Sequence, residues 1–349
     1  MSLFNIILIL RHHFFCRWRQ LLPMYKTLYE NETLRYENGQ RALFAHTFRC
    51  ENGNDNDNGN GKKTVILMVK NETTFCGGLS DRLRGITSVY QECKRQGLDF
   101  KIHFETPNLI DYLEPNEYDW YIKDEDICYD TKRVYPCTIL TYRPLEDKKE
   151  PEVQRSILRW FLKKDYAQIH VYTNMRSGDG EYGKLFHELF KPCKELQEQI
   201  DYHVAKLGGE KQYDAMVFRF RQLLGDFKEG GETLPENERE EYIQRCMRLV
   251  AKEHESNPDK KILVTSDSIT FLNRLAALPY VYVIPGEVVH IGFTYDATKK
   301  TYMKSFVDYY VLSYAKSVTL VRDKKMYHSG FALRAAMLNE AKYKETWMK

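Results

Sequence analysis

The chain has 349 residues, 43 % of them hydrophobic, with 52 lysines and arginines against 49 acidic residues. This length and apolar content are enough for two domains, each with a buried core. The near balance of charge argues against a nucleic-acid partner, which would require a basic excess on one face. An anion site in this chain must therefore depend on a few placed arginines.

The eight cysteines are scattered and form no Cys-x-x-Cys pair, which argues against a zinc site or a redox motif. Cys128 and Cys137 are close enough in sequence to close a small disulfide loop, but free thiols in a reducing compartment are the better interpretation. We therefore expect a cytoplasmic protein.

Residues 1–62 are expected to form a leader and a linker. The apolar run Leu3–Leu10 is shorter than the roughly 20 residues that span a bilayer, and its basic residues follow it, whereas a signal peptide places them first. An interfacial anchor with weak peripheral membrane contact stays open; a disordered leader, or a natural start at Met24, is favoured. The asparagine- and glycine-rich tract 51–63 predicts a disordered linker.

After the linker, apolar strands alternate with helical patterns. Residues 64–69 are a continuous apolar run, typical of a parallel strand covered on both faces. Residues 79–93 then repeat their apolar positions at helical spacing. Further strands are expected at 100–104, 138–141 and 167–172, and a long helix at about 182–207.

A second α/β series begins at Asp214. Its strands are expected at 214–221, 262–265, 280–284 and 318–322, and its helices at 235–255, 269–278, 302–313 and after the turn at 328–332. The boundary between the series lies near 207–212. Two such series predict an α/β fold with two Rossmann-like domains facing a cleft, at 63–208 and 209–349.

The first polar motif, Gly-Gly-Leu-Ser-Asp-Arg at 77–82, lies between the first strand and the first helix. Its glycines let the backbone approach a ligand closely. Ser80 or Asp81 would cap the helix and leave Arg82 near the cleft. The G-x-G-x-x-G spacing of a dinucleotide site is absent, and a plain helix cap with surface arginines is the alternative.

The second motif places two arginines, Arg219 and Arg221, near the carboxyl end of an apolar strand. Residues two apart on a strand share a face, so both side chains are expected to point the same way. Burying them requires an anionic partner, and guanidinium groups bind phosphate in a bidentate manner. Salt bridges to Asp226 or Glu229 are the alternative.

Three further segments follow strands or precede helices, where ligands of open α/β sheets bind. Thr-Ser-Asp-Ser at 265–268 offers hydroxyls and a carboxylate, although helix capping by Asp267 or Ser268 is equally consistent. Asp308 is a carboxylate in an otherwise apolar helix. The turn His-Ser-Gly-Phe-Ala at 328–332 places a hydroxyl and a glycine ahead of the last helix.

The acidic triplet at 124–126 matches the D-x-D pattern of metal-dependent sugar transferases. It follows a polar aromatic stretch rather than a buried strand, so a solvated turn is favoured over a metal site. A metal at Asp124 and Asp126 would fit a GT-A enzyme with a single nucleotide-binding domain instead of two.

Together these segments resemble the fucosyltransferase superfamily of GT-B fold, which includes protein O-fucosyltransferases, α1,2- and α1,6-fucosyltransferases and the nodulation fucosyltransferase. The likeness covers about residues 64–338 and rests on short motifs in the right order. The loop at 77–83 looks like the family's Gly-Gly-Leu-Gly-Asn-Arg-Leu, with Asp81 in place of asparagine. Arg219 falls where the family's His-x-Arg holds the donor pyrophosphate, with Val217 in place of histidine.

The carboxyl-terminal motifs extend this resemblance. Segment 265–267 looks like the family's Thr-Asp segment, and Asp308 matches a carboxylate that contacts the nucleotide. Segment 329–331 matches the serine-containing turn at the phosphates. Phe220 stands where many members have a second arginine, and Arg221 follows it.

The resemblance implies an inverting, metal-independent glycosyltransferase that transfers fucose from GDP-fucose to a glycan acceptor and needs no cofactor. The domain at 63–208 would hold the acceptor, and that at 209–349 the nucleotide sugar. Arg219 would stabilise the leaving GDP, and Asp81 would be the general base. The donor-binding residues would be Gly77, Gly78, Ser80, Arg82, Arg219, Arg221, Asp267, Asp308, Ser329, Gly330 and Phe331. Transfer from another nucleotide sugar, and a non-catalytic nucleotide- or sugar-binding module, are the alternatives.

Overall fold

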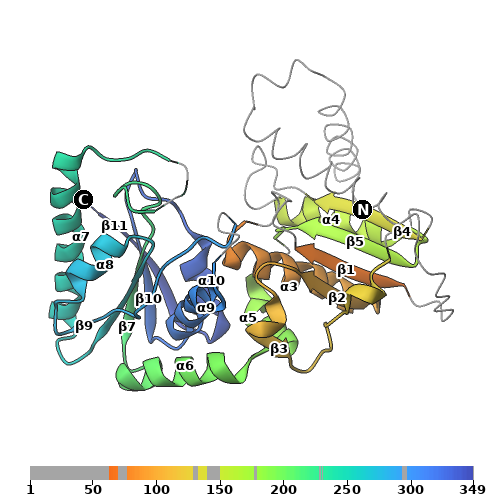
Figure 1. Cartoon of the computed structure of the whole chain (residues 1–349), viewed down its shortest axis with the longest axis horizontal. Helices are drawn as coiled ribbons and strands as arrows, with labels where there is room; N and C mark the ends of the chain where they lie inside the picture. Colours follow the sequence, from red (N-terminus) through yellow and green to blue (C-terminus); the bar gives the residue numbers. More distant parts are fainter. Residues whose placement is uncertain are drawn as a thin grey trace, which may run out of the picture. The chain divides into compact units, whose positions relative to one another are not determined.

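The computed structural model describes residues 63–69, 77–128, 133–139, 150–176, 179–227, 229, 231–292 and 297–348 (Figure 1). The chain divides into two compact units. Unit 1 comprises residues 1–108 and 115–181, and unit 2 comprises residues 109–114 and 182–349. The leader and linker expected at 1–62 lie outside the described residues.

Unit 1 is built on a four-stranded parallel sheet in the order β2-β1-β5-β4. Its strands are β1 (Thr64–Val69), β2 (Asp99–Phe104), β4 (Val134–Ile139) and β5 (Gln168–Thr173), and its helices are α3 (Leu79–Gln96) and α4 (Glu150–Leu162). The apolar run expected as a first strand is β1, whose residues 65–69 are buried. A strand covered on both faces of a parallel sheet must be apolar along its length, as this one is.

Helix α3 follows β1 and is buried along most of its length. It ends at Gly97, whose left-handed conformation (φ 64°) places its N–H at the carbonyl of Lys94. Glu92 of α3 is buried and receives hydrogen bonds from Nε and Nη2 of Arg159 on α4, at 2.8 and 3.0 Å. This pair ties the two helices together.

Unit 2 is built on a five-stranded parallel sheet in the order β11-β10-β7-β8-β9. The strands are β7 (Asp214–Phe218), β8 (Ile262–Ser266), β9 (Val281–Tyr282), β10 (Ser317–Arg322) and β11 (Lys342–Trp347). The helices are α5 (Tyr182–Leu189), α6 (Lys194–Lys206), α7 (Glu236–Ser256), α8 (Ile269–Leu275), α9 (Lys299–Ser313) and α10 (Gly330–Leu338). Among the described residues, the short elements are 3₁₀ turns at 109–111, 124–126 and 179–181, and a two-stranded sheet of β3 (Leu113–Pro115) and β6 (Phe190–Pro192).

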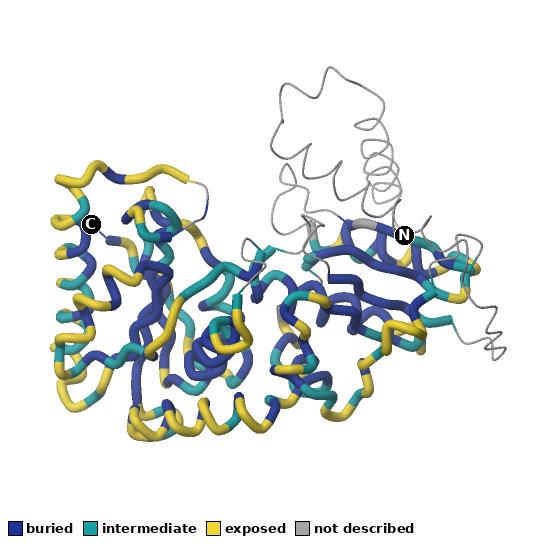
Figure 2. Tube along the Cα trace, viewed as in Figure 1, coloured by how far each residue is buried: buried dark blue, intermediate teal, exposed yellow. Residues whose placement is uncertain are grey.

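The core of unit 2 lies on both sides of its sheet. Alternate residues of β7, such as Met216 and Phe218, pack with the apolar faces of α7 and α8. Helices α9 and α10 lie on the opposite side of the sheet (Figure 1). The strands β7, β8 and β10 are buried, while β11 is partly exposed and α7 keeps an exposed outer face (Figure 2). This is the layered α/β arrangement expected from the alternating pattern.

Several local expectations differ from the structure; for example, the strand expected at 280–284 is the two-residue β9. The helix expected at 182–207 is two helices, α5 and α6, because Pro192 interrupts the pattern. Both belong to unit 2: the hydroxyl of Tyr182 lies 2.6 Å from that of Tyr309 on α9. The strand expected at 214–221 ends at Phe218. The strand β11, whose residues are mostly polar, was not expected from the sequence.

No helix within the described ranges combines the length and the apolar character needed to cross a membrane.

Candidate functional site

The candidate site lies at the carboxyl ends of β7, β8 and β10. The chain leaves β7 to form β8 on one side and later returns to form β10 on the other. In open α/β sheets, ligands bind in the crevice beyond the strands where this reversal occurs. Arg219 directly follows β7, and its carbonyl accepts a hydrogen bond from the N–H of Tyr327, in the loop after β10, at 3.1 Å.

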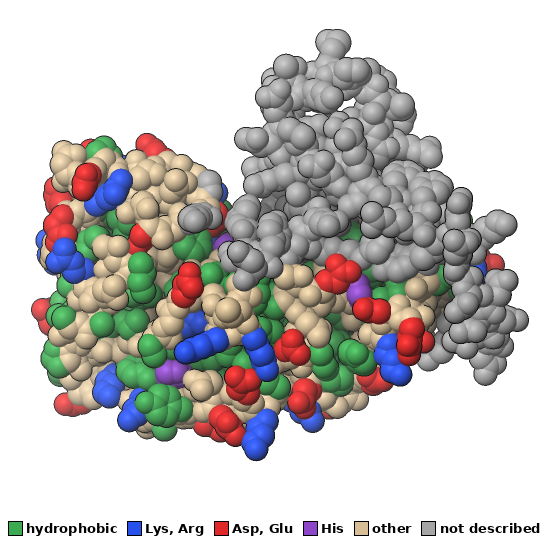
Figure 3. Space-filling view, viewed as in Figure 1, with side chains coloured by type: hydrophobic (Ala, Val, Ile, Leu, Met, Phe, Trp, Pro, Cys, Tyr) green, Lys and Arg blue, Asp and Glu red, His purple; other side chains and the backbone are tan. Residues whose placement is uncertain are grey.

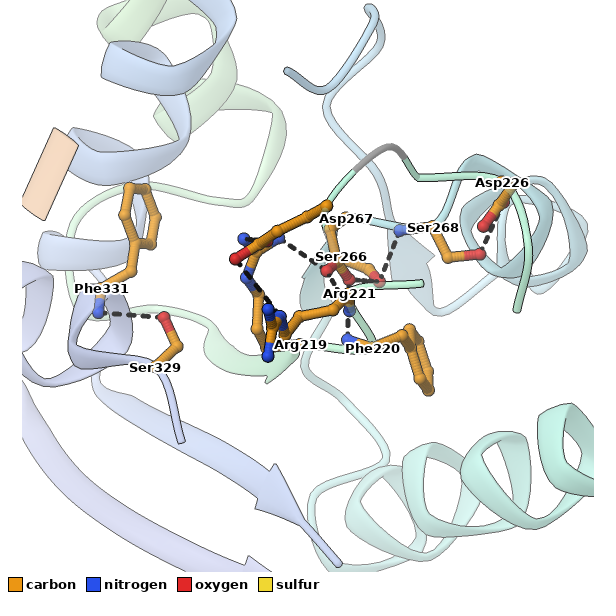
Figure 4. A network of polar contacts seen from close by, with 10 residues as sticks. Arg219, Phe220, Arg221, Asp226, Ser266, Asp267, Ser268, Ser329 and Phe331 are labelled. Carbon is orange, nitrogen blue, oxygen red and sulfur yellow. Dashed lines mark hydrogen bonds and ion pairs between the residues drawn. The ribbon is translucent and has the colours of Figure 1, made fainter. Parts of the chain in front are cut away.

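The side chain of Arg219 is held by two carboxylates (Figure 4). Its Nη1 donates to Oδ2 of Asp267 at 2.6 Å, and its Nη2 donates to Oε2 of Glu229. The guanidinium also lies over the ring of Phe227, 4.9 Å from the ring centre. With 15 % of the side chain exposed, Arg219 is fixed in direction but still reachable from solvent.

Arg221 converges on the same carboxylate. Its Nε lies 3.3 Å from Oε1 of Glu229, and its guanidinium lies 5.1 Å from the ring centre of Tyr327. The expectation that Arg219 and Arg221 share a strand face is wrong, because β7 ends at Phe218 and Arg221 has a left-handed backbone (φ 56°). The two side chains meet through Glu229 instead. The salt-bridge alternative holds for Glu229 and not for Asp226.

Asp267 follows β8 and is buried, with 2 % of its side chain exposed. Besides Arg219, its carboxylate accepts hydrogen bonds from the N–H groups of Phe220 at 2.9 Å and Arg221 at 2.6 Å. Burial raises the pKa of Asp267, and the nearby guanidinium and amides oppose that rise. Asp267 therefore fixes the backbone and the arginine at the end of β7.

The start of α8 is capped by Ser268, one of the two capping residues considered in the sequence analysis. Its Oγ accepts a hydrogen bond from the N–H of Phe271 at 3.1 Å and donates one to Oδ2 of Asp226 at 2.8 Å. The N–H of Thr270 also donates to Asp226. Asp226 thus stabilises the first turn of α8 rather than an arginine.

The turn at 328–332 forms the start of α10. Ser329 is the residue that caps this helix, and its Oγ accepts from the N–H of Phe331 at 3.2 Å (Figure 4). Gly330 is the first residue of the helix. The free N–H groups of such a first turn favour an anion. The same loop carries Tyr327, so the helix start and Arg219 belong to one end of the sheet.

Asp308 lies within α9 and is paired. Nζ of Lys304, one turn earlier, lies 2.6 and 2.5 Å from its two carboxylate oxygens, and both side chains are buried. Burial raises the pKa of Asp308, while the Lys304 ammonium opposes this. The sequence prediction missed Lys304, although the spacing of four residues in a helix could have revealed the pair.

The glycine motif of unit 1 forms the entry to α3. Gly77 has a left-handed backbone (φ 62°), and a Cβ at this position would lie 2.7 Å from Oδ2 of Asp81. Only glycine fits there without displacing that carboxylate. Gly78 is the capping residue and receives no side-chain hydrogen bond, so neither Ser80 nor Asp81 caps the helix. Ser80 is buried.

Arg82 of this motif and Arg84, which follows it in α3, are buried and are not surface arginines. Arg82, with 1 % exposed, donates to the carbonyls of Gly77 at 3.0 Å and Thr106 at 2.9 Å. Arg84 donates to the carbonyl of Asn174 and lies 3.0 Å from Oδ1 of Asp81. Asp81 itself is 35 % exposed. Arg82 therefore braces the glycine turn from inside unit 1.

The remaining expectations concern metal and sulfur. Asp124 and Asp126 form a 3₁₀ turn on the surface; the Asp124 side chain is 93 % exposed, 3.5 Å from Nδ1 of His103. Among the described residues, no three His, Cys, Asp or Glu side chains are grouped as metal ligands would be. Cys128 and Cys137 are free thiols.

Comparisons of structure identify what this fold is similar to. NodZ α-1,6-fucosyltransferase soaked with GDP-fucose matches with a TM-score of 0.53 at 15 % identity, over 79 % of this chain and 92 % of that chain. Fucosyltransferase NodZ from Bradyrhizobium matches with a TM-score of 0.52 at 15 % identity, over 79 % and 93 %. A variant of Arabidopsis thaliana FUT1 in complex with GDP matches with a TM-score of 0.52 at 13 % identity, over 94 % and 78 %.

The chain has the GT-B-like fold of these fucosyltransferases. No family model matches its sequence. No curated protein matches its sequence either. The resemblance inferred from short motifs is thus confirmed for the fold. The sequence identity to these fucosyltransferases is too low for a comparison of whole sequences to detect it.

Proposed function

We propose that this protein is a glycosyltransferase that transfers fucose from GDP-fucose to a glycan acceptor, with inversion and without a metal ion. The observation that carries the proposal is Arg219, a guanidinium fixed by Asp267 at the reversal point of a sheet with a fucosyltransferase fold. The solved neighbours support the choice of donor, since NodZ was soaked with GDP-fucose and FUT1 was in complex with GDP.

In this proposal, unit 2 binds the donor through its diphosphate. Arg219 contacts the phosphate oxygens, and the first turn of α10, at Ser329 and Gly330, offers its N–H groups to the same anion. Both elements stabilise the negative charge that grows on GDP as it departs. Stabilisation by fixed charges and dipoles is often the largest contribution to catalysis, because these groups need not reorganise during the reaction.

The transfer itself needs a base. The acceptor oxygen attacks the anomeric carbon, the bond from that carbon to the phosphate oxygen breaks, and its electron pair stays on GDP. The acceptor proton passes to a carboxylate, and the sugar goes through an oxocarbenium-like state. Asp81 is the proposed base in unit 1: its side chain is partly exposed at the glycine turn, and Arg84 fixes one of its oxygens.

The direct test is turnover. Purified protein is incubated with GDP-fucose and a panel of glycans, in the presence of excess chelator, and the products are followed by mass spectrometry. We expect a glycan heavier by one fucose and an equal amount of GDP. Binding of GDP-fucose with no product would favour the non-catalytic module. Loss of product on chelation, restored by manganese or magnesium, would contradict the metal-free mechanism.

A further inference from the structure

Glu229 connects the two arginines of the site. Its Oε2 accepts from Nη2 of Arg219, and its Oε1 lies 3.3 Å from Nε of Arg221. Only 9 % of its side chain is exposed. Each oxygen of one carboxylate thus contacts a different guanidinium, as two oxygens of a phosphoryl group would.

The two carboxylates on Arg219 are held differently. Asp267 is fixed by the N–H groups of Phe220 and Arg221 in addition to Arg219, so it is part of the framework at the end of β7. The side-chain contacts described for Glu229 go only to Arg219 and Arg221. Burial raises the pKa of Glu229 despite the two guanidinium groups beside it, which indicates a carboxylate that is costly to bury.

We propose that Glu229 occupies the position of one phosphoryl group of the donor and is displaced from Arg219 and Arg221 when the diphosphate binds. This inference rests on the proposed donor site. It assigns the site a ligand class, an anion that bridges both arginines, and it assigns Glu229 the role of an internal competitor. In the free protein the carboxylate pairs with both partly buried guanidinium groups, in addition to the contact of Arg219 with Asp267.

The exchange has a consequence for affinity. A donor must replace two contacts of a charged carboxylate, so part of its interaction with the arginines is offset by the loss of Glu229. An anion that reaches only one arginine leaves Glu229 on the other and gains little. The site is therefore selective for diphosphates over small monoanions, and its affinity is below what the two arginines could provide.

The test is calorimetric titration of inorganic pyrophosphate and of GDP into the full chain. Glu229→Gln keeps the shape and removes the charge; it should bind both ligands about 10–100-fold more tightly than the wild type, the scale of one or two charge-assisted hydrogen bonds. Glu229→Asp, whose shorter side chain cannot span both arginines, should show a smaller gain. Asp226→Asn is the matched control, since Asp226 contacts Ser268 and Thr270, and its affinity should be unchanged.

The outcomes separate this inference from the proposed function. Equal or weaker binding by Glu229→Gln and Glu229→Asp, with a wild type that binds GDP, would overturn the role of Glu229 alone. Failure of the wild type and all variants to bind either ligand would overturn the donor site as well. A gain in Asp226→Asn equal to that in Glu229→Gln would mean that net charge, rather than displacement, sets the affinity.

Discussion

An arginine follows the first strand of each parallel sheet, and the two arginines bind different kinds of hydrogen-bond acceptor. After β1, Arg82 is buried and donates to two backbone carbonyls. After β7, Arg219 is partly exposed and paired with two carboxylates. Carbonyls are neutral and belong to the framework, so Arg82 holds a turn in place. A carboxylate can be exchanged for another anion, so Arg219 has the chemistry of a binding group.

The surface charges give the background to this difference. Most lysines and arginines visible in Figure 3 lie on the surface among acidic residues, as expected of a chain with nearly balanced charge. The candidate site instead depends on a few arginines with fixed directions. The comparison teaches that an arginine in a ligand-binding motif is informative only once its partner is known.

The largest expected effect is on Arg219. Arg219→Lys keeps the charge but loses the planar fork, so turnover should fall roughly 10²–10³-fold, the scale of losing one preorganised donor. Arg221→Lys is the matched variant and should be milder, because the side chain of Arg221 is 34 % exposed and pairs with Glu229, whereas Asp267 is contacted only by the Arg221 backbone N–H. Steady-state turnover measures both. Near-normal Arg219→Lys beside an inactive Arg221→Lys would reverse their assigned roles.

Arg82→Met should affect stability rather than binding. The change leaves the carbonyls of Gly77 and Thr106 without this donor, so the free energy of unfolding should fall by roughly 2–4 kcal/mol, the scale of one or two hydrogen bonds from a charged donor. Arg95→Met is the control: that arginine is 43 % exposed, and the change should cost less than about 0.5 kcal/mol. Urea unfolding gives both values. A Arg82→Met protein of normal stability that no longer binds GDP would show that Arg82 is a ligand contact.

Two glycines with a left-handed backbone flank α3, and their replacement by alanine should have different effects on stability. Gly97→Ala meets no atom within 4 Å, so it should cost only about 1–2 kcal/mol for its backbone conformation. Gly77→Ala adds a methyl group 2.7 Å from the Asp81 carboxylate and should cost more, besides moving the proposed base. Thermal unfolding and turnover, measured together, test this; equal stability of the two variants would mean that the Asp81 side chain moves away freely.

The smallest effect concerns Arg322, whose carboxylate partner Glu345 lies on the edge strand β11. Burial alone would raise the pKa of Glu345, but hydrogen bonds from Arg322, His328 and Tyr343 outweigh it and lower the pKa to about 2. A lowered carboxylate pKa stabilises the fold above the unfolded value of 4.5 and loses this contribution as the pH falls toward 2.

Glu345→Gln should therefore reduce the free energy of unfolding by at most about 1 kcal/mol at neutral pH. The difference from the wild type should shrink between pH 4.5 and 2. Urea unfolding across this range measures it. A difference that stays constant over the range would show that Glu345 contributes through packing and not through its charge.

Much of the fold was predictable because its signals are local. The buried strands β1, β8 and β10 appear as apolar runs in the sequence, and their order predicts a layered α/β protein. The strand β11 escaped prediction because an exposed edge strand with alternating lysine and tyrosine has no apolar run. Strand ends are set by tertiary contacts, which is why β7 ended before Arg219 and not after it.

The residues of the candidate site could be predicted from the sequence, but the contacts between them could not. Arg219 and Asp267 stand out as polar residues after apolar strands. Their contact joins positions 48 residues apart through the parallel pairing of β7 and β8, which no local pattern encodes. The backbone partners of Arg82 were equally unpredictable, because the carbonyl of Thr106, which accepts from its side chain, follows the end of another strand. The hydrogen-bond partner of each arginine indicates its role, and that partner is set by how the strands pair in the folded sheet.

The most direct measurement is a thermal-shift comparison of nucleoside diphosphates on the wild-type protein. A ligand at 100 times its dissociation constant adds about 2.7 kcal/mol to the free energy of unfolding. GDP should raise the melting temperature at concentrations where UDP and CDP do not. Arg219→Lys should remove most of this shift. Arg82→Met should keep it, when each GDP measurement is compared with the melting temperature of the same variant without ligand. Equal stabilisation by UDP, or a GDP shift unaffected by Arg219→Lys, would contradict a guanosine diphosphate site at the end of β7.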